Sequence, residues 1–268
     1  MSRTLAMFAV GFFVSTSAFA GPVIPLTNTL PRCVDCFAGP ISIGFDINFF
    51  GNDYSQLYVN NNGNISFNQG LSNWTFDDPW PSYGLSYGAN TVISPFFGDV
   101  DTTSAGSPVA YGSLIYDGRQ AFAVNWVDVP RHSDSHTIGT SSSRNSFQVI
   151  LVERSDVGTG DFDIVFNFDY IQWQNSNIYG GSFFGYGANG NYYGYTTNNN
   201  QLLTLNGSQL PYNSINSDVA GRYVFEVRGG VVTNPLPLLT AVPEPETWVM
   251  LLAGLGLVSG MARRRTKR

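Results

Sequence analysis

Hydrophobic and polar residues alternate along several stretches of this chain, and a period of two residues predicts β-strands. The clearest stretch is 161–169, where apolar residues share one face and aspartate and asparagine occupy the other. Its apolar face consists of Phe162, Ile164, Phe166 and Phe168. The alternation recurs at 120–129, 147–151 and 223–227. Each pattern indicates a strand that buries one face and presents the other to solvent.

Short turns rich in glycine separate some of these strands. The stretch 111–127 contains Asp-Gly near its centre, and 57–67 contains Asn-Gly. Both dipeptides accept the positive φ angles of tight hairpin turns. Two β-hairpins are therefore predicted.

The body of the chain contains no convincing 3.6-residue apolar period, which an amphipathic helix would show. We expect an all-β fold, an antiparallel β-sandwich-like single domain that buries one face of each sheet. Two stretches are expected to be loops: the serine-rich 132–145 and the stretch 179–200, which is rich in glycine, tyrosine and asparagine.

Residues 1–20 have the features of a secretory signal peptide. Arg3 supplies a positive start, an apolar run follows, and an Ala-Phe-Ala cleavage site ends at Ala20. We expect export through the Sec translocon.

Residues 242–268 combine three segments in a fixed order. Pro243-Glu244-Pro245 should be extended, because proline fixes φ and disfavours helix in the residue before it. An uncharged apolar segment at about 248–262 is expected to form a short transmembrane helix, below the roughly 20 residues that span a bilayer comfortably. Five cations end the chain and should stay on the cytoplasmic side. They include Arg263, Arg264 and Arg265.

This order of Pro-Glu-Pro, apolar segment and arginine cluster resembles the PEP-CTERM sorting signal. The resemblance implies an exported protein of a Gram-negative bacterium, whose tag is recognised and removed by exosortase, a membrane protease. It also implies a precursor tethered to the inner membrane and a mature form at the cell surface or in the extracellular matrix, in bacteria that often make exopolysaccharide.

The body between the two signals is strongly acidic. It contains seven arginines, no lysine and 17 aspartate and glutamate residues, so its net charge is about −10. A body of this charge repels phosphate backbones, which argues against nucleic acid as a partner.

Several segments of the body, in a consistent order, resemble the NIDO domain, the extracellular domain first named in nidogen. They are LYVNNNGNISF at 57–67, ISPFFGDVDT at 93–102, VNW at 124–126, NSFQVIL at 145–151, the strand 162–170, GYGAN at 185–189 and GRYVF at 221–225. The resemblance covers roughly 45–228, and leaves 21–44 as an N-terminal segment and 229–241 as a linker. It implies a domain of matrix and adhesion-type proteins that has no catalytic activity and therefore no catalytic residues.

Cys33 and Cys36 are the two cysteines of the chain. A structural zinc site needs four ligands, and no second pair exists. A redox Cys-x-x-Cys opens a helix in a thioredoxin-like fold, and no such context follows. In an oxidising compartment a local disulfide is the expected state, with reduced thiols as the alternative.

Asp99 and Asp101 lie two residues apart, so an extended segment places both carboxylates on one side, separated by about 7 Å. Such a pair can share a calcium ion or act as an acid–base pair. The favoured interpretation is a structural pair that accepts backbone hydrogen bonds at a strand end. No other cofactor is expected.

The two histidines, His132 and His136, flank Asp134, and the three side chains together could bind a transition metal. Their position in an expected loop favours solvated side chains instead. The chain contains no G-x-S-x-G sequence, which a hydrolase nucleophile on a sharp turn would require.

The tyrosines of 179–200 alternate with polar residues, so burial of every ring is not expected. Exposed aromatic rings beside asparagine and glycine can stack on sugars or contact a protein. The alternative is a glycine-rich loop packed on the sandwich. The candidate ligand surface comprises Tyr186, Tyr192, Tyr193 and Tyr195.

Together these features predict an exported surface or biofilm-matrix protein whose NIDO-like domain mediates adhesion or matrix interaction, without being an enzyme. The expected partner is extracellular polysaccharide or a matrix protein. A calcium-dependent carbohydrate-binding module is the first alternative, and a secreted hydrolase is the second.

Overall fold

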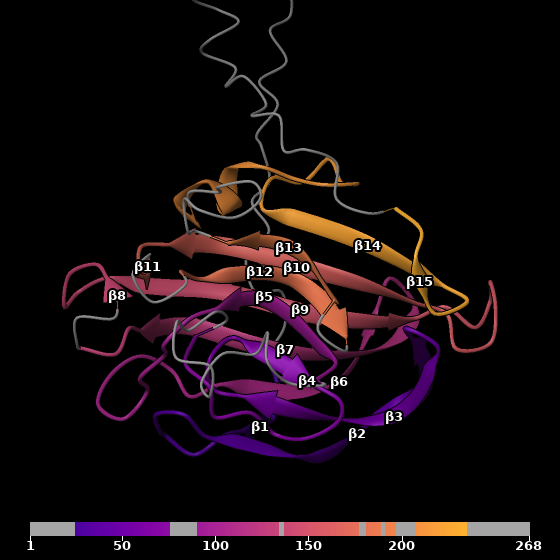
Figure 1. Ribbon diagram of the computed structural model, residues 1–268, viewed down its shortest axis with the longest axis horizontal. Coiled ribbons are helices and arrows are strands. Elements are labelled where there is room, and N and C mark those ends of the chain that lie inside the picture. Colours follow the sequence, from indigo (N-terminus) through magenta and orange to yellow (C-terminus); the bar gives the residue numbers. More distant parts are fainter. Residues whose placement is uncertain are drawn as a thin grey trace, which may run out of the picture. The chain divides into compact units, whose positions relative to one another are not determined.

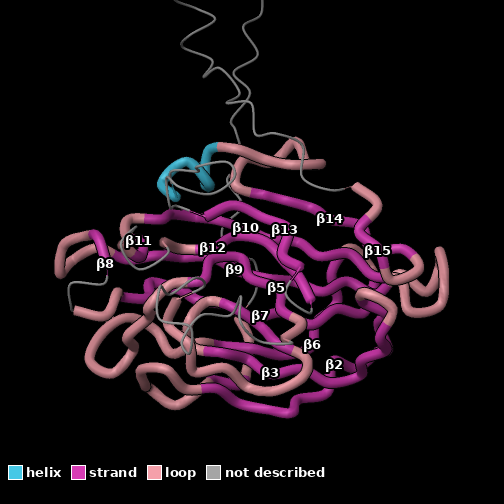
Figure 2. The backbone as a smooth tube through the Cα atoms, viewed as in Figure 1, coloured by secondary structure: helices cyan, strands magenta, loops and turns pink. Residues whose placement is uncertain are grey.

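The computed structural model describes residues 25–75, 90–133, 137–176, 181–188, 191–196 and 207–234. Strands dominate this part of the chain, and the short 3-10 helix η3 (Gly207–Tyr212) is its one helix (Figure 2). The strands form two large antiparallel sheets and one small one (Figure 1). The prediction of an all-β fold with antiparallel sheets is confirmed.

The first large sheet has seven strands, and it contains all four strands whose alternation is described above. In spatial order they are β1 (Asn28–Thr29), β6 (Ala110–Tyr116), β7 (Arg119–Pro130), β9 (Arg144–Glu153), β10 (Phe162–Ile171), β14 (Arg222–Arg228) and β15 (Val231–Val232).

The second large sheet has six strands. In spatial order they are β13 (Asn191–Thr196), β12 (Phe183–Ala188), β5 (Val92–Phe97), β4 (Asn64–Ser66), β3 (Asn52–Asn60) and β2 (Phe37–Phe49). The small sheet pairs β8 (Thr137–Ile138) with β11 (Gln174–Asn175).

The core lies between the two large sheets. All four residues of the predicted apolar face of β10 are fully buried. Rings of the two sheets meet there: the ring centroids of Phe49 and Phe162 are 5.6 Å apart, and those of Tyr186 and Phe225 are 5.5 Å apart. The alternating aromatic faces of the two sheets therefore make one aromatic core, as a β-sandwich requires.

Both predicted hairpins are present. The β6–β7 turn has positive φ at Asp117 (49°) and Gly118 (76°), as the Asp-Gly sequence indicates. The β3–β4 turn has positive φ at Gly63 (79°). A Cβ atom on Gly63 would lie 1.8 Å from the carbonyl oxygen of Phe96, so the close approach of β5 also requires glycine.

A row of polar side chains crosses the face of the seven-stranded sheet opposite the core. Asn125, Gln148, Asn167 and Arg222 are neighbours on β7, β9, β10 and β14. Gln148 Nε2 donates to Asn125 Oδ1 at 2.5 Å, Asn167 Nδ2 to Gln148 Oε1 at 2.8 Å, and Arg222 Nε to Asn167 Oδ1 at 3.1 Å.

The three amide side chains of this row are at most 4 % exposed. Asn167 was predicted to face solvent, and that prediction is wrong in one respect: the side chain lies on the outer face but is buried. Burial is tolerated because each amide finds a hydrogen-bond partner in its neighbour.

The stretch 179–200 was predicted to be a loop, and this is wrong for 183–188 and 191–196. β12 and β13 form a hairpin at the edge of the six-stranded sheet. Cβ atoms on Gly185 and Gly194 would each lie 2.2 Å from a carbonyl oxygen of the facing strand. The glycines therefore permit close pairing of two strands, rather than marking an irregular loop.

The ends of the domain extend into segments that were expected to flank it. β1 and much of β2 lie in 21–44, and β15 lies in the expected linker 229–241. The signal peptide at 1–20 and the expected transmembrane segment at about 248–262 lie outside the described residues. Within the described ranges, no helix is long and apolar enough to cross a membrane.

Candidate functional site

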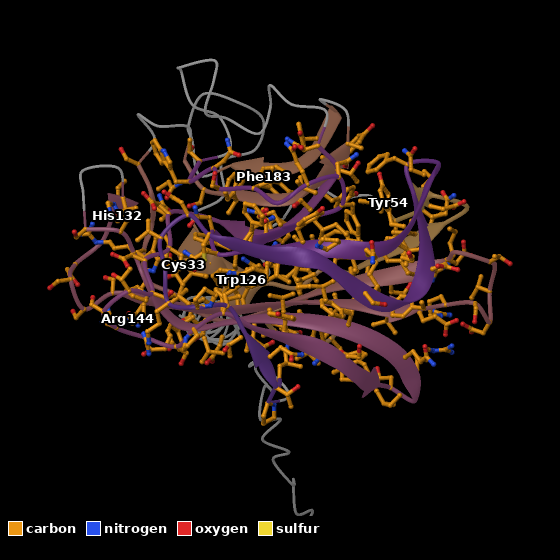
Figure 3. The ribbon with its side chains drawn as sticks, turned by 90° about the horizontal axis from the view of Figure 1, so that it is seen from below. Cys33, Tyr54, Trp126, His132, Arg144 and Phe183 are labelled. Carbon is orange, nitrogen blue, oxygen red and sulfur yellow. A yellow bond between two sulfur atoms is a disulfide. The ribbon has the colours of Figure 1, made fainter. Side chains whose placement is uncertain are left out.

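The two cysteines, the two aspartates and His132 gather toward one end of the sandwich. Figure 3 shows Cys33, His132 and Arg144 toward the same end, whereas Tyr54 lies toward the other. This polar end combines the disulfide loop, the β3–β4 turn, the segment that follows β5, the end of β7 and the start of β9.

Cys33 and Cys36 are joined by a disulfide. The loop that it closes is tied to the segment after β5: Cys33 N donates to Thr102 Oγ1 and Thr102 N donates to the Cys33 carbonyl oxygen, both at 3.0 Å. Asn61 N donates to the Cys36 carbonyl oxygen at 2.8 Å. The disulfide closes this loop, and the hydrogen bonds hold it against the segment after β5 and the β3–β4 turn.

Asp99 and Asp101 have different environments. Asp99 is 3 % exposed, its backbone N donates to Asn175 Oδ1 at 2.9 Å, and its carboxylate lies 3.8 Å from His132 Nδ1. Asp101 is half-buried, and its Oδ1 accepts hydrogen bonds from the N and Oγ1 of Thr103 at 2.8 and 2.5 Å. β5 ends at Phe97, so the alternation that would place both carboxylates on one side does not continue.

No group of three or more histidine, cysteine, aspartate or glutamate side chains that could hold a metal occurs among the described residues. Asp134 and His136 lie outside them. A calcium ion at Asp99 or Asp101 would need amide, hydroxyl or carbonyl oxygens to complete six to eight ligands, and the calcium site stays a prediction.

Asparagines of the β3–β4 turn hold the segment after β5 in place. Asn61 Nδ2 donates to the carbonyl oxygen of Val100 at 2.5 Å, and Asn62 Oδ1 accepts from the backbone N of Val100 at 3.0 Å. Asn62 Nδ2 also donates to Asp35 Oδ1 at 2.6 Å in the disulfide loop. Both asparagines are at most 1 % exposed, so they serve as scaffold rather than as ligand contacts.

A polar pocket of about 190 Å³ opens at this end of the domain. Asp101, Ser104, Ala105, Pro130, Arg131, Ser133, Ser141 and Arg144 line it. Two of these residues carry guanidinium groups and one carries a carboxylate. This pocket could not be predicted from the sequence, because its residues come from separate loops and share no local motif.

Three of the other arginines take part in ion pairs with carboxylates. Arg154 Nη1 and Arg228 Nη2 bind the two oxygens of Asp163 at 2.7 and 2.6 Å, and Arg119 Nη1 lies 2.6 Å from Asp156 Oδ1. The hydrogen bond from Arg154, together with the charges of Arg154 and Arg119, lowers the pKa of Asp156. The charges of these three arginines are therefore paired with carboxylates of the protein itself.

The four candidate tyrosines of the β12–β13 hairpin do not form one exposed surface. Tyr186 and Tyr195 are 1 % and 3 % exposed and belong to the core. Tyr192 is half-buried against Phe183. Tyr193 is 51 % exposed and stacks on Phe50 with ring centroids 6.1 Å apart. Of the four rings, only that of Tyr193 is largely available to a ligand.

The domain as described matches a known family. A family model described as NIDO related covers residues 25–217. The chain belongs to the NIDO-related family. The matched region of this NIDO-related chain begins before the expected boundary at residue 45, and includes the disulfide loop, both aspartates and the polar pocket.

Alpha-tectorins are relatives of this NIDO-related chain. Alpha-tectorin of Gallus gallus is 27 % identical over 231 residues, which cover 78 % of this chain and 10 % of that protein. Alpha-tectorin of Mus musculus is 30 % identical over 222 residues, which cover 74 % of this chain and 10 % of that protein. The chain spans about a tenth of the length of these curated relatives. No solved structure matches it.

A second family model, described as the PEP-CTERM protein-sorting motif, covers residues 241–265. This part of the chain contains Pro243, Glu244, Pro245 and the three arginines named above, and it lies outside the described residues. The motif implies processing by exosortase, a membrane protease, and therefore export.

Proposed function

We propose that this NIDO-related protein is exported, loses its C-terminal tag to exosortase, and then acts as a non-enzymatic adhesion or matrix protein at the surface of a Gram-negative bacterium. The observation that carries the proposal is the order of the two family matches: a NIDO-related domain at 25–217 is followed by a sorting motif at 241–265. The domain is the part that remains after processing, and it mediates contact with polysaccharide or protein of the matrix.

The chemistry of the body supports this proposal. Seven arginines, no lysine and 17 acidic residues make it strongly anionic, which suits a protein that stays soluble outside the cell. The disulfide between Cys33 and Cys36 is stable in an oxidising compartment and uncommon in the cytosol. The uncharged segment before the terminal arginines tethers the precursor in the membrane until it is cleaved.

The test is a comparison of the natural protein with a variant in which Pro243, Glu244 and Pro245 are all replaced by alanine. We expect the natural protein to reach the surface or matrix fraction without its C-terminal peptide. The variant should accumulate in the membrane fraction with that peptide intact, because exosortase does not recognise it. Fractionation followed by mass spectrometry of the C-terminus measures both outcomes.

A matched control replaces Pro235 and Pro237, which precede the motif, by alanine and should leave processing unchanged. An intact Arg268 on surface-exposed natural protein would overturn the processing step. Natural protein that is cleaved but recovered entirely in the culture medium, with none bound to cells or matrix, would overturn the adhesion step.

A further inference from the structure

Charged and hydroxyl side chains from three separate stretches converge on the polar pocket. The segment after β5 contributes Asp101 and Ser104, and the segment after β7 contributes Arg131 and Ser133. The loop before β9 contributes Ser141, and Arg144 is the first residue of that strand. The serines are exposed, and the two arginines are half-buried. A ligand here would therefore meet both cationic and hydroxyl groups.

The protein itself holds both guanidinium groups in place. Arg131 Nη1 donates to Thr137 Oγ1 at 2.7 Å and to the carbonyl oxygen of His132 at 3.0 Å. Arg144 Nη1 donates to the carbonyl oxygens of Ser141 and Ser143, both at 2.9 Å. These bonds fix the position of each cation before any ligand arrives, which lowers the entropy cost of binding.

The Arg144 guanidinium has hydrogen-bond donors that remain available to a ligand. Within the described part of the chain it makes no ion pair with a carboxylate, and its side-chain hydrogen bonds both leave from Nη1. Its Nε and Nη2 groups form the planar fork that binds a carboxylate through two parallel hydrogen bonds. This arrangement contrasts with Arg154 and Arg228, whose charges are taken up by Asp163.

Asp101 narrows the choice of ligand. One of its oxygens accepts two hydrogen bonds from Thr103, and a carboxylate on the wall of the pocket disfavours a simple inorganic anion. The same carboxylate accepts hydrogen bonds from hydroxyl groups. The lining therefore favours a small ligand that carries a carboxylate and neighbouring hydroxyl groups. The acidic side chain of a peptide carries a carboxylate but no such hydroxyl groups.

The size of the pocket agrees with such a ligand. Its volume of about 190 Å³ is below the roughly 300–1,000 Å³ of sites for drug-sized molecules. It admits a single ring rather than an extended ligand. One sugar residue of a longer chain, with its neighbours outside the pocket, fits this limit.

We propose that this pocket binds a uronate residue of an acidic polysaccharide. Arg144, with Arg131 beside it, holds the sugar carboxylate, while Asp101 and the serine hydroxyls bond to the ring hydroxyls. This inference rests on the proposed function in one respect: export is what brings the protein to the polysaccharide outside the cell. Because the whole body is anionic, recognition depends on contacts within the pocket and not on long-range attraction.

Isothermal titration calorimetry of the exported protein tests this inference at physiological ionic strength, where repulsion from the acidic body is screened. The probes are trigalacturonate, neutral galactotriose and a triglutamate peptide. The variant Arg144→Gln removes the guanidinium fork. The matched control Arg119→Gln removes one charge from the opposite end of β7, at a residue that pairs with Asp156.

We expect trigalacturonate to bind, with affinity at least tenfold lower in Arg144→Gln and within twofold of the natural protein in Arg119→Gln. Galactotriose and triglutamate should bind at least tenfold more weakly than trigalacturonate. The inference is overturned if trigalacturonate does not bind, if the two variants bind it equally, or if triglutamate binds as tightly. Should Arg144→Gln fail to fold, Ser104→Tyr fills the pocket from an exposed position and must cause the same loss.

Retention of the natural protein in the extracellular matrix is measured separately. Retention without trigalacturonate binding would reject the pocket inference and leave the proposed function standing. Trigalacturonate binding without retention would leave the pocket standing and reject the proposed function.

Discussion

The indole Nε1 of Trp126 donates a 2.9 Å hydrogen bond to the carbonyl oxygen of Asn61. Trp126 lies on β7 of the seven-stranded sheet, and Asn61 lies in the β3–β4 turn of the six-stranded sheet. Both residues are fully buried. The bond therefore joins the two sheets beside the asparagine scaffold that positions the segment after β5.

Replacing Trp126 by phenylalanine should destabilise the domain by about 3 kcal/mol. The change leaves a buried carbonyl oxygen without its donor, which costs about 1–3 kcal/mol, and removes part of a large core side chain. Urea unfolding measures the loss. The control Ile115→Val, at a position that is 64 % exposed, should stay within about 0.5 kcal/mol of the natural protein. A loss below about 1 kcal/mol in Trp126→Phe would mean that the bond contributes little.

Gly63 and Gly118 have similar φ angles but different surroundings. Alanine variants at the two positions therefore distinguish the free-energy cost of a positive φ from that of a steric clash. Gly63 has φ 79° and Gly118 has φ 76°. A Cβ atom on Gly118 meets nothing within 4 Å, whereas one on Gly63 would lie 1.8 Å from the carbonyl oxygen of Phe96. Alanine at Gly118 should cost about 1–2 kcal/mol for the left-handed conformation alone.

Alanine at Gly63 should cost at least about 2 kcal/mol more than alanine at Gly118, because β5 or the turn must also move. Thermal unfolding of the two variants gives the difference directly. Equal melting temperatures would show that β5 yields to the added methyl group without cost.

The sequence predicts the parts of this fold that depend on local alternation. β10 shows why: its four apolar residues are two positions apart, and all are fully buried. The β12–β13 hairpin was missed, because Gly185 and Gly194 interrupt the alternation and suggest a loop. Their function is to let two backbones approach closely, which depends on a facing strand and leaves no local signal.

The candidate site was less predictable than the fold. The disulfide between Cys33 and Cys36 was predicted, because two closely spaced cysteines in an exported protein favour a local disulfide. Asp99 and Asp101 were expected to be a structural pair at a strand end, with a shared calcium ion or an acid–base pair as alternatives; β5 ends before them, and their environments differ. Arg144 was not predicted to be a site residue. It lines the pocket only because the segments after β5 and β7 lie next to it in the folded chain.

Replacing both Cys33 and Cys36 by serine should lower stability by about 2 kcal/mol. The loop that the disulfide closes is short, so the entropy it removes from the unfolded chain is modest. Thermal unfolding with and without dithiothreitol provides the measurement: reductant should lower the melting temperature of the natural protein and leave that of the double variant unchanged. Detection of two free thiols in the exported protein would contradict the expected disulfide.

Alkaline pH should unfold this domain through its buried tyrosines. Burial is the main cause that raises the pKa of Tyr186 well above its usual value near 10, and the neighbouring Tyr193 and Tyr195 act in the same direction. Burial likewise raises the pKa of Tyr223. Both rings are at most 1 % exposed. In the unfolded chain the same phenols ionise near pH 10.

The unfolded state therefore loses these protons first as pH rises. The stabilisation is fully present below about pH 10 and is lost progressively above it, because the folded state keeps its phenols neutral until their raised pKa is reached. Each such tyrosine should contribute a slope of up to about 1.4 kcal/mol per pH unit to the free energy of unfolding. Tyr186→Phe removes one of these groups, so urea unfolding between pH 8 and 11 should show a shallower slope than in the natural protein. An unchanged slope would mean that Tyr186 ionises equally in both states, which its place in the core contradicts.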